Sequence, residues 1–199
     1  MMSTGSRVRR AIRRAPLVLL VAATLLAGGS AAAAQRRTNA VADAQAEFQH
    51  RLQNYIKLRQ ELAGKLKPLS PTASAAEISA RQETLAAALR DVRKDARPGD
   101  VIPAAAAVEI KRIIAADFSR RKPRTKRAVF DEVPANVQPM INKTLPDTAA
   151  LATVPPLLLN ELPRLPDNLQ YRFVGNAVVL LDGDTRLIVD YITNVIPAH

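Results

Sequence analysis

The sequence contains no cysteine and no tryptophan, and its 199 residues include only two histidines. Without cysteine the chain forms neither disulfides nor thiolate metal sites, so packing alone has to stabilise it. Two histidines, His50 and His199, are too few for a histidine metal cluster and offer little for a nucleophile paired with a base. The seven glycines include no glycine-rich phosphate loop. We therefore expect no catalytic residue, no metal and no cofactor.

The apolar run near the N-terminus is too short for a permanent membrane span. It covers residues 17–27, 11 residues against the roughly 20 that a spanning helix needs. Five arginines and no acidic residue precede it, Gly28-Gly29-Ser30 is expected to break it, and alanines 31–34 follow. This order is typical of a secretory signal peptide, with cleavage near Ala34. We expect a periplasmic or secreted mature chain; the alternative is an uncleaved membrane anchor.

The positive charge of the mature chain is concentrated in one place. Cleavage removes five of the 29 basic residues, which leaves 24 basic against 18 acidic residues and a net charge of +6. Six basic residues lie within the window 120–127, and without them the mature chain is balanced. They are Arg120, Arg121, Lys122, Arg124, Lys126 and Arg127.

Apolar periodicity predicts three helices between residues 35 and 122. The first is expected over 39–67, with apolar residues at steps of three and four and charged or amide residues, Arg59 among them, elsewhere. The second is expected over 75–96, where Ser74 and Glu77 have capping-box spacing. The third is expected to begin at a cap, Asp100, and to end near Arg121. The inner face of the second helix is predicted to carry Ile78, Leu85, Leu89 and Val92.

Each of these helices has one apolar stripe, so we expect them to pack side by side as a bundle. The stripe of the first helix continues for about four heptads. It could therefore also pair with a copy of itself or with another protein, which would make the chain a homo-oligomer.

Residues 123–168 are rich in proline, which excludes long regular helices there. A short edge strand is predicted over 137–141 and a short helix over 155–162, capped by Thr153. The four leucines of that short helix predict burial against the bundle. We therefore interpret 123–168 as an extended segment wrapped onto the fold.

Residues 169–199 have the pattern of a β-meander and a tail. Three runs rich in branched and aromatic residues, 170–174, 177–182 and 186–192, are separated by Gly175-Asn176 and Gly183-Asp184. Glycine and asparagine accept the backbone angles of tight hairpins. Ile188 and Ile192 are expected to share one face of the last strand. The predicted fold class is α+β, mainly α, with an N-terminal bundle of about three helices and a C-terminal three-stranded antiparallel meander.

The acidic residues of the meander are the remaining candidates for chemistry. Asp182 and Asp184 flank a glycine, which is typical of a hairpin turn. Asp190 is predicted to form an ion pair with Arg172 across the sheet. If the protein is a carboxylate-dependent hydrolase instead, Asp182, Asp184, Asp190 or Glu132 should line one pocket.

Three stretches of the C-terminal half carry a resemblance to other proteins: 162–175 (LPRLPDNLQYRFVG), 180–182 (LLD) and 187–192 (LIVDYI). With them, about residues 98–197 resemble a group of uncharacterised exported bacterial proteins, while the first helices show little likeness. The resemblance implies export and carries no known activity. The closing hairpin alone is also similar to small periplasmic proteins linked to metal homeostasis, which would imply a metal-handling accessory role. The sequence has no histidine-rich tract to support it.

The basic window supplies the most specific functional prediction. Outside the cytoplasm the available polyanions are lipids, lipopolysaccharide and wall polymers, and nucleic acid is not expected. The window has no interleaved aromatic residues for stacking on bases. We therefore predict a noncatalytic envelope protein that binds a protein partner or an anionic surface. The alternative is that the window binds nothing: its side chains are solvated, interact favourably with the C-terminus of a helix and keep the protein soluble.

Overall fold

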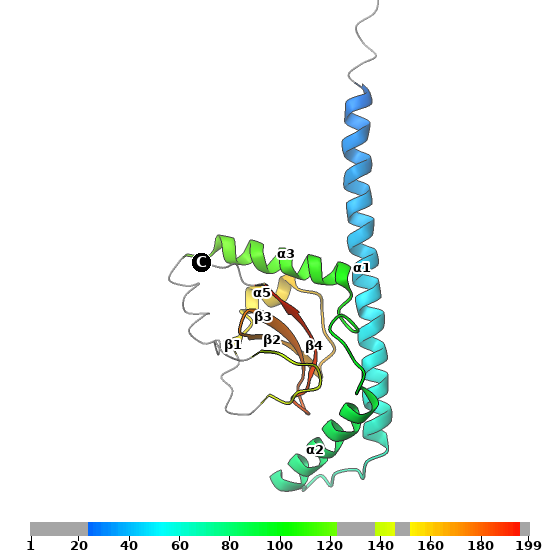
Figure 1. The fold of residues 1–199 in the computed structure, drawn as a ribbon, viewed down its shortest axis with the longest axis vertical. Coiled ribbons are helices and arrows are strands. Elements are labelled where there is room, and N and C mark those ends of the chain that lie inside the picture. The colour runs from blue at the N-terminus through cyan, green and yellow to red at the C-terminus, as the bar shows by residue number, and fades with distance from the viewer. Residues whose placement is uncertain (1–23, 123–137, 146–151, 196–199) are drawn as a thin grey trace, which may run out of the picture. The chain divides into compact units, whose positions relative to one another are not determined.

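A computed structural model describes residues 24–122, 138–145 and 152–195 (Figure 1). The chain divides into two compact units, 1–39 and 40–199. Every side chain discussed below belongs to the second unit. In the part of the chain that the structure describes, no helix is both long and apolar enough to cross a membrane.

The predicted α+β class is confirmed. Three main helices, α1 (Thr24–Gly64), α2 (Ala75–Val92) and α3 (Ala104–Arg120), precede a short helix α5 (Pro156–Glu161). The C-terminal strands β2 (Leu169–Val174), β3 (Ala177–Asp182) and β4 (Ile188–Thr193) form the predicted antiparallel meander. A two-residue strand, β1 (Ala152–Thr153), extends the sheet on the β2 side.

The sheet has one face against the helices and one against the segment before residue 146. Tyr171, Phe173 and Leu180 belong to the core that the helices share, whereas Leu181 and Ile188 pack with Leu145 on the opposite face. The expectation that Ile188 and Ile192 share a face is wrong. Leu180 pairs with Asp190 and Leu181 with Ile188, so Val189 is an extra residue in β4. Such a bulge shifts the alternation of side chains by one position.

One core unites the helices and the sheet, so the helices do not form a separate bundle interior of their own. Phe48 and Leu52 of α1, Leu89 of α2 and Ile110 of α3 belong to the same apolar cluster as Phe173 of β2. All five are fully buried. Most of the apolar stripe of α1 packs against the chain's own sheet and helices, while Val41 at its start is 41% exposed. Self-association through this helix stays a prediction.

Helix boundaries differ from the sequence prediction where local signals compete. Gly28-Gly29-Ser30 does not interrupt the helix but lies inside α1. Glycine can adopt helical backbone angles at a cost of about 1 kcal/mol relative to alanine. The capping box of Ser74 and Glu77 is confirmed. Asp100 does not cap α3. Its carboxylate accepts the Arg97 amide within the turn before the helix, and Pro103 occupies the cap position.

Several predicted inner positions face solvent. Ile78 and Val92 are 40% and 54% exposed, because α2 is buried only in its middle, at Leu85, Ala86 and Leu89. Of the four leucines predicted to be buried in this short helix, Leu158 of α5 and Leu162 just after it are buried, while Leu157 and Leu159 are exposed, since so short a helix can bury only one side.

Two local predictions between α3 and β2 are also wrong. Thr153 lies in β1 rather than capping α5. Residues 138–141 contain no strand; a turn follows, with Asn142 at a positive φ of 62°, and Thr144 makes an isolated bridge to Leu187. Residue 137 lies outside the described part of the chain.

Candidate functional site

Asp190 anchors the loop between α2 and α3 to the sheet. It is fully buried on the face of β4 that meets the helices. Its carboxylate accepts the backbone N–H groups of Gly99 at 3.0 Å, Val101 at 2.9 Å and Ile102 at 2.7 Å. The predicted ion pair with Arg172 is wrong, because β3 separates the two strands and Arg172 lies opposite Val179. The carboxylate instead satisfies amides that would otherwise be buried without acceptors.

Asp182 performs the same task for α1. One oxygen accepts the turn amides of Asp184 and Thr185, at 3.2 and 3.0 Å, which confirms the predicted turn role. The other accepts the Tyr55 hydroxyl at 2.9 Å and Arg59 Nε at 2.8 Å. Asp182 is fully buried, and Arg59 also donates to the partly exposed Asp184.

The buried role of Arg59 was missed by the sequence prediction, which placed this residue on the solvated face of the first helix. Its side chain is only 9% exposed. The signal was its position four residues after Tyr55 and three before Leu62, which places all three on one side of a helix. A charged residue within an apolar stripe predicts a buried partner, since a buried charge has to be paired.

Arg93 closes the same layer from the end of α2. Its Nη2 donates to the carbonyl of the bulge residue Val189 at 2.8 Å, and Nη1 donates to Asn142 Oδ1 at 3.1 Å. The guanidinium carbon lies 5.2 Å from the centre of the Tyr55 ring. Burial lowers the pKa of Arg93, with the negative groups around it opposing that shift. The bulge thus frees a carbonyl that a helix-terminal arginine then uses.

These carboxylates are structural anchors with separate partners, and they do not line one pocket as the hydrolase hypothesis requires. Each oxygen of Asp182 already accepts two hydrogen bonds, and Asp190 is occupied by the loop amides. Glu132 lies outside the described residues. Within those residues no group of three metal-ligating side chains is found.

Two buried tyrosines should make the fold sensitive to alkaline pH. Burial and then the neighbouring Asp182 raise the pKa of Tyr55 well above its ordinary value of about 10, and burial alone raises the pKa of Tyr171. The folded chain therefore keeps both protons above pH 10, where the unfolded chain releases them.

We expect the free energy of unfolding to fall above pH 10 by about 1.4 kcal/mol per pH unit for each tyrosine. Urea titrations between pH 9 and 11.5 measure this slope. Tyr171→Phe should remove about half of the tyrosine contribution, since its hydroxyl donates only to the Pro163 carbonyl. An identical slope in the native chain and in the variant would contradict the assignment.

The basic window begins in the last turn of α3. Arg120 donates to both Glu161 oxygens, at 2.8 and 3.1 Å, and its side chain stays 60% exposed. Arg121 is held more tightly, with Nε 2.6 Å from Asp117 Oδ2 and its guanidinium 5.8 Å from the Phe118 ring centre. Lys122 is exposed. Arg124, Lys126 and Arg127 lie outside the described residues. Arg121 is therefore mainly structural, whereas Arg120 and Lys122 present charge to solvent.

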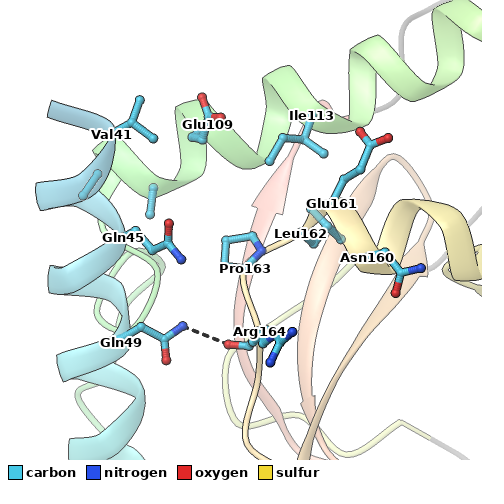
Figure 2. Close-up of a pocket in the computed structure, with 12 residues that line it drawn as sticks. Val41, Gln45, Gln49, Glu109, Ile113, Asn160, Glu161, Leu162, Pro163 and Arg164 are labelled. Carbon is cyan, nitrogen blue, oxygen red and sulfur yellow. Dashed lines mark hydrogen bonds between the residues drawn. The ribbon is translucent and has the colours of Figure 1, made fainter. Parts of the chain in front are cut away.

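A groove of about 570 Å³, not expected from the sequence, lies between α1, α3 and the segment that follows α5 (Figure 2). Its lining combines apolar residues, such as Ala44, Ala106 and Leu162, with the polar side chains of Gln45, Gln49, Glu109 and Glu161. Gln49 Nε2 donates to the Arg164 carbonyl at 2.8 Å, and this hydrogen bond links α1 to the segment that follows α5.

Comparison with known proteins adds no identity to this geometry. No family model, no curated protein and no solved structure matches the chain.

Proposed function

We propose that this chain is an exported, noncatalytic protein of a bacterial cell envelope that binds an anionic surface through the basic window 120–127. The observation that carries the proposal is the concentration of the whole mature net charge in the sequence window 120–127, whose first residue, Arg120, ends α3. Its likeness to exported bacterial proteins belongs to the same proposal.

The ion pairs of Arg120 and Arg121 indicate which cations of the window are available to bind an anionic surface. Asp117 and the Phe118 ring hold Arg121, so its charge is largely used within the fold. Arg120 shares its charge with Glu161 but remains mostly exposed. Lys122 and the three basic residues after it in the sequence supply the rest. Near an anionic membrane each free cation contributes on the order of 1 kcal/mol, within a Debye length of about 8 Å.

We expect neutralisation of four window residues, Lys122→Gln, Arg124→Gln, Lys126→Gln and Arg127→Gln, to weaken binding to anionic vesicles by roughly two to three orders of magnitude at low salt. Cosedimentation at low and high salt measures this loss. The four substitutions leave the internal pairs of Arg120 and Arg121 intact.

A matched control neutralises four exposed lysines elsewhere: Lys57, Lys65, Lys67 and Lys94. The net charge is the same in both variants, so only a site at the window predicts a difference between them. Equal binding by the two variants, or binding unchanged from the native chain, would overturn the proposal.

The groove between α1, α3 and the segment after α5 favours a second candidate, the binding of a protein partner. Its lining mixes apolar and polar side chains, and non-obligate interfaces are mixed in the same way. The test is a photoreactive residue in place of Gln45. Crosslinking to one envelope protein, without binding to anionic vesicles, would support this candidate instead.

A further inference from the structure

The short helix α5, which contacts α3, presents an exposed leucine. Leu157 is 75% exposed, more than any other large apolar side chain in the described part of the chain. Leu159, on the same short helix, is 39% exposed. Leu158 between them is fully buried and anchors α5 to the core. The helix is therefore fixed in the fold while it presents leucine to solvent.

The position of Leu157 relative to the cations follows from α5. Glu161 lies four residues after Leu157, so the two side chains share one side of the helix about one turn, or 5.4 Å, apart. Glu161 in turn pairs with Arg120 in the last turn of α3, and the two helices are in contact. Figure 1 shows α5 beside α3. Leu157 thus lies one helical turn from the carboxylate that binds the first cation of the window.

We infer that the anionic surface is a lipid bilayer, and that Leu157 inserts into it while Arg120 and Lys122 contact the headgroups. This inference rests on the proposed function and names its ligand. A polyanionic wall polymer supplies charge but no apolar phase, so it would leave the leucine in water. Binding to anionic membrane interfaces grows with the apolar area that is buried and with electrostatic attraction, and leucine together with cations supplies both.

The geometry also explains why the charges can stay hydrated. Arginine and lysine side chains extend along an apolar surface while their charged ends remain in water. Interfacial segments lie only about 5–10 Å into the headgroup region, a depth that one leucine on a short helix can reach. Phe118 of α3 and Leu158 of α5 belong to the same core, so the leucine and the cations meet the surface as one unit.

The test uses the full mature chain and vesicles of neutral lipid alone or with anionic phosphatidylglycerol. We expect Leu157→Ala to weaken binding to the anionic vesicles about fiftyfold, because roughly three buried carbon atoms are removed. Val108→Ala is the matched control. Val108 is 69% exposed on α3, twelve residues before Arg120, which is about 18 Å along the helix.

A second variant reports the position of the side chain directly. The chain has no tryptophan, so Leu157→Trp introduces a single tryptophan whose emission reports on this position. On anionic vesicles we expect its emission to shift to shorter wavelength and to be quenched by brominated lipid. Val108→Trp should show neither effect.

The outcomes separate this inference from the proposed function. Salt-sensitive binding to vesicles and to a soluble polyanion alike, with Leu157→Ala unaffected and Leu157→Trp unquenched, would overturn insertion and leave the anionic-surface function intact. Absence of binding to both probes would overturn the two together. A Leu157→Trp emission already shifted without vesicles, and dependent on protein concentration, would show that a second copy covers the leucine and would also overturn insertion.

Discussion

Replacing Asp190 by alanine is expected to lower the free energy of unfolding by about 3–5 kcal/mol, a large share of the 5–15 kcal/mol typical of a domain. The variant leaves the amides of Gly99, Val101 and Ile102 without their acceptor. Two of the three amides belong to buried residues, where water replaces the carboxylate poorly. Urea or thermal denaturation of the purified chain measures the loss.

Asp95→Asn is the matched control, because Asp95 is exposed in the same connection between α2 and α3. Its effect should stay within about 0.5 kcal/mol. Hydrogen exchange gives a second reading, since the amides of the 99–102 loop should lose protection in the Asp190 variant more than those of β2. A loss below 1 kcal/mol would contradict the role of Asp190 as the acceptor for this loop.

Arg59→Met should destabilise the fold by a similar amount, about 3–5 kcal/mol, although it replaces a charged side chain by an apolar one of comparable length. The reason is that Asp182 would remain a fully buried carboxylate without its cation. The Arg112–Glu109 pair provides the comparison, because the Arg112 side chain is 67% exposed. Arg112→Met should cost less than about 1 kcal/mol.

A double-mutant cycle distinguishes the pair from general damage to α1. Asp182→Asn keeps an oxygen for the Asp184 and Thr185 amides and removes the charge. If Arg59 acts through that charge, the combined loss in Arg59→Met with Asp182→Asn should be smaller than the sum of the single losses by about 1–3 kcal/mol. Additive losses would contradict direct coupling across the helix–sheet interface.

The two carboxylates explain how this chain holds helices on a small sheet without disulfides. Asp182 accepts hydrogen bonds from α1, and Asp190 accepts hydrogen bonds from the α2–α3 loop. Both lie on the same face of the meander. Arg93 adds the end of α2 by reaching the bulge carbonyl of Val189. Each contact satisfies a group that burial would otherwise penalise, so the layer is specific as well as stable.

The sequence by itself determined the elements whose signals are local. The period of apolar residues predicts α1, α2 and α3, the Ser74–Glu77 spacing predicts the start of α2, and the glycine turns predict the meander. These signals act between residues a few positions apart, so a linear reading captures them. The local charge of the window 120–127 is likewise a property of the sequence alone.

Only the tertiary structure decided where the polar groups act. Arg59 and Asp182 are separated by 123 positions and Asp190 and Ile102 by 88, so no local pattern links them. The bulge at Val189 depends on pairing between β3 and β4, and it alone moves Ile188 to the far face. The pairing of Arg120 with Glu161, one helical turn from the exposed Leu157, requires α3 and α5 to meet. Periodicity marks a residue as apolar or polar, but which element covers it is set by the arrangement of the whole chain.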